Sequence, residues 1–285
     1  MIRTSRRLSP AAVRGGIVTF LLMLLTAMEL YPIFSIVANS FKRLPDFFRS
    51  PIELPRRLYF GNYIVAFDKL NYFRSLLNTS IILVFSMLVL ILAGSMAAFI
   101  IARRPGKWSH LVYLFFVFGI VLPTFTMLVP QIKLIGDLGL KNNYISLILL
   151  YGAMGMPMSL FLYTGFFGSI PRELEEAAKM DGSGLFQTYF RIFMPLAAAT
   201  TTTLVMLQSI GIWNDFVLPD LIMTQPEYKT LMPALNGFYG RMLGQGTRWD
   251  YIYAAIVLCI LPMIFIFFMA NRYLIRGVVE GAIKG

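Results

Sequence analysis

Residues 168–195 read GSIPRELEEAAKMDGSGLFQTYFRIFMP and lie between two long apolar runs. Ser169 is suited to cap a helix, and Pro171 is suited to its first turn. Lys179 follows Glu175 by four residues, the favourable order for an i, i+4 ion pair. The N-terminal end of this helix, where the helix dipole favours negative charge, carries Glu173, Glu175 and Glu176. The segment is therefore expected to begin with a short polar helix.

The second half of the same segment predicts another short helix. Asp181-Gly182 stops the first helix, because glycine readily adopts a positive φ. Ser183 is suited to cap the next helix, and Pro195 ends it. Its apolar face would consist of Leu185, Phe186, Tyr189, Phe190 and Phe193. We therefore expect two short helices joined by a tight glycine turn at a membrane surface.

The composition excludes an ordinary soluble domain. Of 285 residues, 58% are hydrophobic and 14% are charged, whereas soluble domains average about 45–50% apolar and about 25% charged residues. A disordered chain is excluded by the same values, and the single Cys259 excludes a disulfide-stapled secreted domain. The net charge of +11 suits basic loops beside a bilayer, because no basic run is interleaved with aromatic residues as in nucleic-acid binding. The sequence predicts a polytopic membrane protein that binds no nucleic acid.

Six apolar segments are long enough to cross a bilayer, which requires about 20 residues each. They are 17–37, 76–101, 111–129, 144–167, 197–223 and 252–273. The predicted fold is therefore all-α, with six transmembrane helices within residues 17–273, a preceding segment 1–16 and a tail 274–285. Glycine and proline interrupt several spans, which is tolerated where neighbouring helices satisfy the released backbone groups.

The N-terminus allows two interpretations. Four arginines precede the first apolar run, as in a signal peptide. The run is longer than the about 7–15 residues usual for a signal peptide, and no A-x-A cleavage site follows, so a retained helix is favoured. Six spans place both termini on one side of the membrane. Lysine and arginine divide almost evenly between the two sides, and the short basic loop 103–107 together with the basic N-terminus favours cytoplasmic termini.

Two surroundings suit segment 168–195 on chemistry alone. An interfacial helix pair would lie among lipid headgroups. The three clustered carboxylates disfavour this arrangement, because an anionic membrane surface would repel them. A protein partner with basic or hydrogen-bonding groups fits the first helix better.

The spacing within this segment resembles that of bacterial ABC importer permeases. Residues 176–195 follow the pattern E-A-A-x3-G-x9-I-x-M-P, similar to the family's E-A-A-x3-G-x9-I-x-L-P loop, with Met194 in place of leucine. Residues 175–182, EEAAKMDG, look like the carbohydrate-uptake branch and its MalG-like subunit. Residues 213–216, WNDF, and 277–285, GVVEGAIKG, are similar to two further segments of those subunits. The resemblance runs from about residue 71 to the end.

The resemblance implies a MetI-like permease fold in the bacterial inner membrane. A second, MalF-like permease subunit would complete the pathway, two ATPase subunits would bind ATP and Mg, and an extracytoplasmic solute-binding protein would deliver solute. No cofactor is expected in this chain. Segment 168–195 would be a cytoplasmic coupling helix in a groove of one ATPase subunit, which also places both termini in the cytoplasm. The implied coupling residues are Glu175, Glu176, Ala177, Ala178, Asp181, Gly182, Ile192 and Pro195.

Four of these residues have a specific expected role. Glu176 would make a charge-assisted hydrogen bond inside the groove. Ala177 and Ala178 are small enough for a close approach, and Gly182 would set the angle between the two short helices. The alternative for Glu176 is a solvated helix face.

Polar residues of the fifth span are candidates for the substrate path. Thr201, Gln208 and Asp215 recur every seven residues and therefore share one side of the helix. Polar groups within a bilayer usually face the bundle interior, and carbohydrate recognition combines aromatic faces with amide and hydroxyl hydrogen bonds. Interhelix hydrogen bonding explains each residue equally well. The further candidates are Trp213, Asn214 and, from the fourth span, Tyr151, which packing also explains.

Other functions have less support in the sequence. Glu29 lies within the first span, but no second deep carboxylate completes a proton relay for an ion-coupled carrier. The sequence has one histidine, His110, and no metal-ligand cluster, P-loop or glycine-rich phosphate motif, so an enzyme is not expected. The favoured interpretation is a non-catalytic permease subunit for a di- or oligosaccharide, and another polar solute such as glycerol phosphate stays open.

Overall fold

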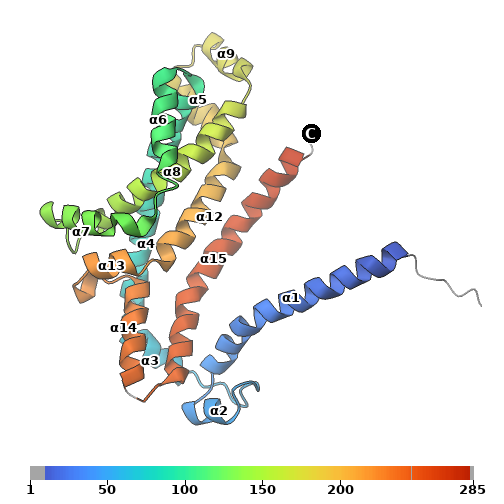
Figure 1. Ribbon diagram of the computed structural model, residues 1–285, viewed down its shortest axis with the longest axis vertical. Helices are drawn as coiled ribbons and strands as arrows, with labels where there is room; N and C mark the ends of the chain where they lie inside the picture. Colours follow the sequence, from blue (N-terminus) through green and yellow to red (C-terminus); the bar gives the residue numbers. More distant parts are fainter. Residues whose placement is uncertain (1–9, 245, 283–285) are drawn as a thin grey trace, which may run out of the picture. The chain divides into compact units, whose positions relative to one another are not determined.

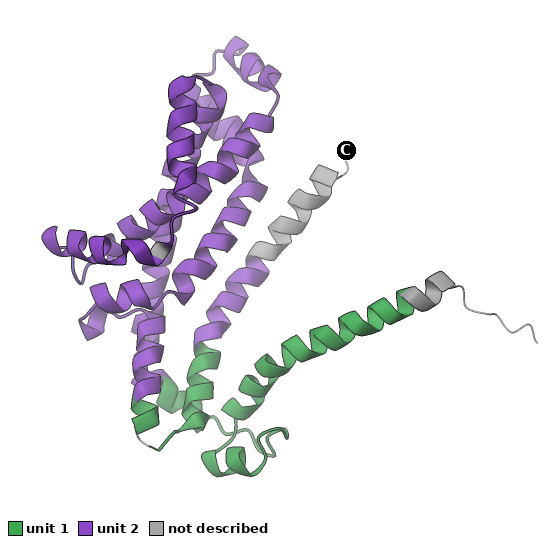
Figure 2. Cartoon of the chain, viewed as in Figure 1, with its two compact units in different colours: residues 1–66, 241–258 green, residues 67–240, 259–285 purple. Residues whose placement is uncertain are grey.

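The computed structural model describes residues 10–244 and 246–282. Within these residues the regular structure is entirely helical, as the apolar runs predict. The chain divides into two compact units, coloured green and purple in Figure 2. The first comprises residues 1–66 and 241–258, and the second comprises 67–240 and 259–285.

The first unit begins with the long helix α1, Pro10–Ser40 (Figure 1). Its residues Gly15–Ser40 are apolar enough to cross a membrane, which confirms the first predicted span. Most of its side chains are exposed, Glu29 included. The unit also contains α2 (Leu44–Arg49), most of α3 (Gly61–Lys69), the end of α14 (Leu231–Gly244) and the start of α15 (Trp249–Ala282).

The second unit is built around two long helical segments. One joins α4 (Tyr72–Val89), the π-helical turn η1 (Leu90–Gly94) and α5 (Ser95–Arg103), and the other is α8 (Tyr144–Ser169). The remaining elements before the bend at residue 197 are α6 (Lys107–Phe118), η2 (Thr124–Met127), α7 (Leu128–Asp137), α9 (Arg172–Met180), α10 (Leu185–Thr188), η3 (Tyr189–Phe193) and α11 (Met194–Leu196). After it come α12 (Ala198–Asn214), α13 (Val217–Ile222), η4 (Pro226–Tyr228), most of α14 and the rest of α15.

The third predicted span, 111–129, is not one helix. Helix α6 has 12 residues, about 18 Å of length, which is less than the about 30 Å of a hydrocarbon core. The helix stops at Phe118, and a turn leads through Gly119 to Pro123, which has no N–H to continue the helical ladder. The apolar run continues instead through η2 into α7.

The fifth predicted span, 197–223, is also divided. Helix α12 ends at Asn214 because Asp215 has an extended backbone, with φ −70° and ψ 126°. The Asp215 carboxylate accepts the N–H of Val217, the first residue of α13, at 2.9 Å. The N-terminal end is bent as well, since residues Leu185–Leu196 meet α12 at 71°.

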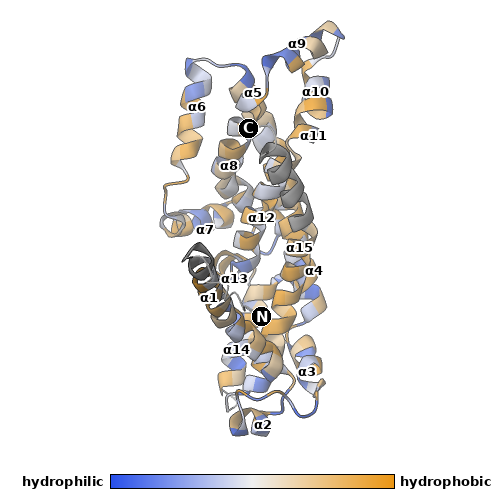
Figure 3. Ribbon diagram, turned by 90° about the vertical axis from the view of Figure 1, so that its right-hand side faces the viewer, coloured by the Kyte–Doolittle hydropathy of each residue, from blue (hydrophilic) through white to orange (hydrophobic). Residues whose placement is uncertain are grey.

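The described residues therefore confirm four spans as single helices and not six. These four segments are Gly15–Ser40, Tyr72–Arg103, Tyr144–Ser169 and Trp249–Met269, and the bent pair at Ala197 is a fifth candidate. In Figure 3 the hydrophobic colour follows α12 and α15, whereas α9 carries hydrophilic residues. The predicted tail, 274–285, continues α15 as far as Ala282, and the predicted segment 1–16 is helical from Pro10, while residues 1–9 and 283–285 lie outside the described residues.

Small residues allow the two long segments of the second unit to pack closely. Ser159 on α8 is buried, and its hydroxyl donates to the carbonyl of Leu90 at 2.9 Å. A Cβ added to Gly94 would lie 2.7 Å from the Ser159 Cβ, and one added to Gly155 would lie 2.7 Å from a Leu90 methyl group. Both glycines therefore allow η1 to approach α8 closely. Gly165, also on α8, has no atom within contact distance of an added Cβ.

We expect Gly94→Ala to lower the free energy of unfolding by about 1–3 kcal/mol, because a methyl group there overpacks the interface. Gly165→Ala is the matched control and should be neutral or slightly stabilising, since alanine is the better helix former by about 1 kcal/mol. Thermal unfolding of the detergent-purified protein measures both effects. In a Ser159→Gly background the loss caused by Gly94→Ala should shrink. Equal losses in the two backgrounds would contradict this account of the contact.

Candidate functional site

The polar helix predicted in segment 168–195 is α9, and it begins later than Ser169. Ser169 is the last residue of α8, and its hydroxyl donates back to the Phe166 carbonyl at 2.7 Å. The residue that precedes α9 is Pro171, which offers no side-chain cap. The prediction that Ser169 caps this helix is therefore wrong, because α8 extends two residues further than its apolar run.

The glycine turn after α9 has the predicted conformation. Gly182 has φ +78°, a value that favours glycine. Its N–H donates to the Lys179 carbonyl at 3.0 Å, and the Ser183 N–H donates to the Ala178 carbonyl at 2.9 Å. These two bonds satisfy carbonyls that the end of a helix leaves free. Ser183 does not cap the next helix, because α10 starts after Gly184, whose N–H donates to the Gln187 side chain at 3.3 Å.

The second helix of the segment is divided into three consecutive short helical elements. It runs through α10, the π-helical η3 and α11, so Pro195 lies inside α11 and not at its end. The predicted apolar face is split between two environments. Tyr189 and Phe193 are buried, whereas the exposed side chains are Leu185, Phe186 and Phe190.

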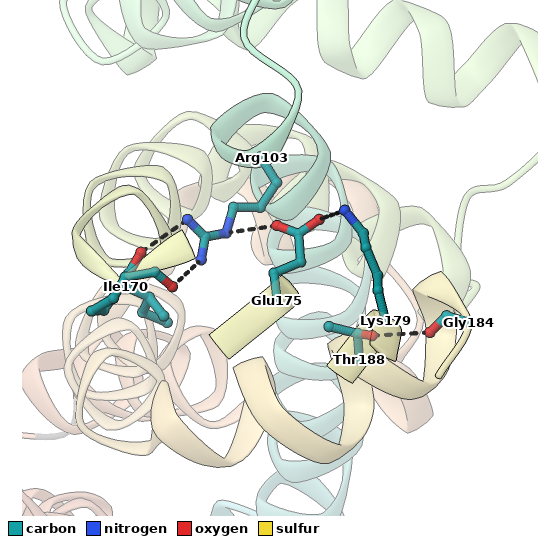
Figure 4. A network of polar contacts seen from close by, with 7 residues as sticks. Arg103, Ile170, Glu175, Lys179, Gly184 and Thr188 are labelled. Carbon is teal, nitrogen blue, oxygen red and sulfur yellow. Dashed lines mark hydrogen bonds and ion pairs between the residues drawn. The ribbon is translucent and has the colours of Figure 1, made fainter. Parts of the chain in front are cut away.

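Helices α9 to α11, residues 172–196, form an elbow. A single guanidinium group connects this elbow to the long helices of the unit (Figure 4). Arg103 is the last residue of α5, and its side chain is 5% exposed. Its Nη1 and Nη2 atoms donate to the carbonyls of Ile170 at 2.9 Å and Pro171 at 3.1 Å, the two residues between α8 and α9. Its Nε lies 3.4 Å from the Glu175 carboxylate. Arg103 therefore joins α5, the end of α8 and α9.

The guanidinium also lies over an aromatic ring. The Arg103 Cζ atom is 4.6 Å from the centre of the Phe193 ring, a cation–π distance. Phe193 packs edge to face on Phe99 of α5 at 4.8 Å and on Phe167 of α8 at 5.7 Å. Both halves of the elbow are thus attached to the same pair of membrane helices.

The adjacent carboxylates Glu175 and Glu176 have different surroundings. Glu175 accepts the predicted i, i+4 ion pair from Lys179 at 2.8 Å and also faces Arg103. Glu176 is exposed and has no ion-pair partner among the described residues. Ala178 is buried against the chain. The remaining predicted coupling residues are the exposed Ala177, Asp181, Gly182 and Pro195 and the half-buried Ile192.

The free side of the elbow is partly apolar. Met180 is 83% exposed and Phe186 is 64% exposed. Leu174 on α9 and Phe190 on η3 are exposed as well, as is the carboxylate of Glu176. Exposed apolar side chains beside a charge, on a helix fixed from behind, suit contact with another protein.

A hollow of about 300 Å³ lies within the second unit, and a few polar side chains interrupt its mainly apolar lining. Among its lining residues Tyr151 donates its hydroxyl to the Asp215 carboxylate at 2.9 Å. The amide side chain of Gln208 also lines it, and Phe125, 75% exposed, supplies an aromatic ring. Three of the predicted substrate-path residues are therefore gathered at one place.

Gln131 also lines this hollow, although it was not among the residues predicted from the sequence. Its side-chain oxygen is buried without a hydrogen-bond partner in the described part of the chain. Buried polar atoms are usually hydrogen-bonded, so an orphan beside a hollow marks a place for a donor. Gln131 lies in α7, beyond the third predicted span, and only the break at residues 119–123 brings α7 to this hollow.

The other three substrate-path candidates lie elsewhere. The hydroxyl of Thr201 is 2.8 Å from that of Tyr163 and bonds within α12. Trp213 is buried, and its Nε1–H donates to the Cys259 carbonyl at 3.2 Å. Asn214 is exposed at the end of α12. Thr201 and Trp213 therefore bond to neighbouring helices, which is the alternative explanation for such polar residues, and Asn214 lies at a helix end. No group of three or more potential metal ligands occurs in residues 10–244 and 246–282.

Comparison with known proteins agrees with this geometry. The permease protein AmyC of Thermoanaerobacterium thermosulfurigenes, described as a probable starch degradation products transport system component, is 32% identical over 95% of this chain and 98% of its own. The melibiose/raffinose/stachyose import permease protein MelC of Bacillus subtilis is 32% identical over 94% of this chain and 96% of its own.

A solved structure and a family model complete the comparison. A bacterial ABC transporter involved in the import of the acidic polysaccharide alginate has the same fold, with a TM-score of 0.79 at 22% identity over 95% of this chain and 99% of that one. Residues 90–280 match the family described as binding-protein-dependent transport system inner membrane component. That match covers more than half of the chain, and the chain therefore belongs to the family of binding-protein-dependent transport system inner membrane components.

Proposed function

We propose that this protein is the permease subunit of an ATP-driven importer and forms half of the pathway for a carbohydrate, most simply a di- or oligosaccharide. Family membership and the sugar-import names of the relatives AmyC and MelC support this proposal. The observation that carries it is the elbow α9–α11, which is fixed from behind by Arg103 and exposes Glu176 and Met180 on its free side.

In this proposal the elbow transmits motion from an ATPase subunit to the membrane helices. A coupling element needs a rigid connection to the part that it moves. Arg103 and Phe193 supply that connection to α5 and α8, and the exposed side supplies the docking surface. Gly182 sets the angle between α9 and α10. Glu176 makes a charge-assisted hydrogen bond in the groove of the partner.

The remaining parts of the importer belong to other chains. ATP and Mg are held by two ATPase subunits, a second permease subunit completes the pathway, and an extracytoplasmic binding protein delivers the sugar. Docking of the elbow on an ATPase subunit puts it in the cytoplasm together with both termini of this inner-membrane protein.

The hollow between α7, α8, α12 and α13 serves as this subunit's part of the sugar path. Its volume of about 300 Å³ lies at the lower end of the range for small-molecule sites, about 300–1,000 Å³. Tyr151, Asp215 and Gln208 offer hydroxyl, carboxylate and amide groups, and Phe125 offers a ring face. A sugar hydroxyl can donate to the unpartnered oxygen of Gln131.

The first prediction concerns the free face of α9. Glu176→Lys should abolish uptake while the chain still inserts and folds, because Glu176 is exposed and forms no ion pair within the described part of the chain. Glu173→Lys makes the same charge change on an exposed position of the same helix and should retain most uptake. Sugar uptake and co-purification of the ATPase subunits measure the effect. Normal uptake in Glu176→Lys would show that the elbow does not couple.

The second prediction concerns the fixed side of the elbow. Arg103→Gln releases the carbonyls of Ile170 and Pro171 and the carboxylate of Glu175. Bonds from a charged donor contribute about 1.5–3 kcal/mol, so we expect α9 to loosen. ATP hydrolysis by the assembled complex should then continue with much less sugar imported per ATP. Arg104→Gln, at the exposed neighbouring arginine, should keep the normal ratio, and an unchanged ratio in Arg103→Gln would contradict the rigid connection.

The third prediction concerns the hollow. Tyr151→Phe removes one hydroxyl from the lining and releases Asp215, so we expect a higher KM for uptake with little change in stability. Tyr144→Phe is the matched control on the same α8, since its hydroxyl donates to Asn78 at 2.7 Å and lies outside the lining. Transport assays over a range of sugar concentrations compare the two variants. Equal KM values would remove Tyr151 from the sugar path.

A further inference from the structure

A second hollow, in the first unit, begins where α1 ends. Helix α1 finishes at Ser40, and residues 42–59 then surround a space of about 450 Å³. The apolar part of α1, Gly15–Ser40, has 26 residues, about 39 Å of helix and enough to cross a bilayer completely. The hollow therefore follows directly on the point where the chain leaves the membrane.

The backbone around this hollow is held by buried polar side chains. Asn39 donates to the Pro51 carbonyl at 3.0 Å, and the Lys42 ammonium donates to the Ser50 carbonyl at 2.7 Å. Asn62 donates to the carbonyls of Ser40 at 2.8 Å and Lys42 at 2.7 Å. Asn39, Lys42 and Asn62 are all less than 5% exposed. Buried hydrogen bonds therefore hold the loop of residues 42–59 in a defined conformation.

The lining carries an excess of positive charge. Asp46 and Glu53 are its two carboxylates, and its cations are Lys42, Arg43, Arg49, Arg56 and Arg57. None of the four arginines lies within ion-pair distance of a carboxylate in the described residues. Arg43 instead lies over the Tyr59 ring at 4.6 Å. Several guanidinium groups around one space suit a phosphate, because each can donate two parallel hydrogen bonds to its oxygens.

Exposed apolar side chains alternate with these arginines. Phe48, Ile52 and Leu54 are 63%, 74% and 65% exposed, and Leu58 and Phe60 are 59% and 58% exposed. Mixed aromatic, aliphatic and basic side chains next to a membrane helix are typical of the interface between headgroups and acyl chains. The phosphate of a lipid headgroup matches the cations, and its acyl chains match the apolar side chains beside them.

We propose that this hollow binds the phosphate headgroup of an anionic phospholipid at the membrane face where α1 ends. The inference is independent of the transport function proposed above, because it uses only residues of the first unit. Burial lowers the pKa of the Lys42 ammonium, against the opposing effect of Glu53 and Asp46. A phosphate in the hollow adds negative charge beside this partly desolvated cation and would stabilise its charged form.

The test uses the full-length protein, purified in detergent with its co-purifying subunits and stripped of lipid. Short-chain phosphatidylglycerol, short-chain phosphatidylcholine and inorganic phosphate are added separately, and binding is followed by native mass spectrometry and by thermal shift. We expect phosphatidylglycerol to bind more tightly than either other probe. The double variant Arg56→Gln, Arg57→Gln should weaken that binding about tenfold or more, because it removes two charged donors that can pair with the phosphate oxygens.

Two further variants separate charge from folding. Arg56→Lys, Arg57→Lys keeps the charge and should retain part of the binding, whereas Arg104→Gln, Lys107→Gln removes two exposed charges outside the hollow and should change nothing. Equal binding of phosphatidylglycerol by the wild type and the double glutamine variant would overturn the site. Inorganic phosphate binding as tightly as the lipid would overturn the lipid assignment and leave a free anion as the ligand. Loss of a co-purifying subunit in the glutamine variant, with lipid binding intact, would assign the surface to a protein and also overturn the proposal.

Discussion

The structure of the elbow depends on the need to satisfy backbone carbonyls where α8 stops and α9 begins. A helix end leaves carbonyls without partners, and buried polar groups without partners are costly. The side chain of Arg103, on α5, donates hydrogen bonds to the carbonyls of Ile170 and Pro171 at this junction, and its Nε faces Glu175. One side chain thereby sets the position of α9 relative to both α5 and α8. With the rear of α9 occupied in this way, its exposed side chains are free to contact another molecule.

This arrangement gives different roles to residues that look alike in sequence. Glu175 and Glu176 are adjacent carboxylates, yet one is used within the chain and the other is free. Ala177 and Ala178 divide in the same manner, because Ala178 is buried and Ala177 is exposed. On a helix, neighbouring positions lie about 100° apart, so one residue of each pair faces inward. For the same reason Tyr189 and Phe193 are buried. Phe186 and Phe190, on the other side of the helix, are exposed.

The sequence was sufficient for the features that depend on local chemistry. The helical class, four of the spans, the i, i+4 pair at Glu175 and the turn at Gly182 all follow from residues close together in the chain. Glycine and proline within the third span indicated a kink but not the end of a helix, and the break at Asp215 was missed. Both lie inside continuous apolar runs, and hydropathy does not register a missing N–H or a side-chain bond to the backbone. Arg103 and Gln131 could not be found at all. Their roles depend on contacts with residues far away in sequence, Arg103 with Ile170 and Gln131 with the hollow lined by Tyr151 and Asp215.

The proposed function requires contact between the free side of α9 and an ATPase subunit. The most direct measurement is photo-crosslinking from a reactive amino acid placed at Met180, 83% exposed, in membranes that contain the assembled importer. The same group at Trp108, 81% exposed on α6, is the control for general accessibility. We expect a crosslink from position 180 to an ATPase subunit that is absent or much weaker from position 108. Crosslinks from position 180 to lipid alone, or to a protein on the opposite face of the membrane, would show that the elbow does not dock on the ATPase.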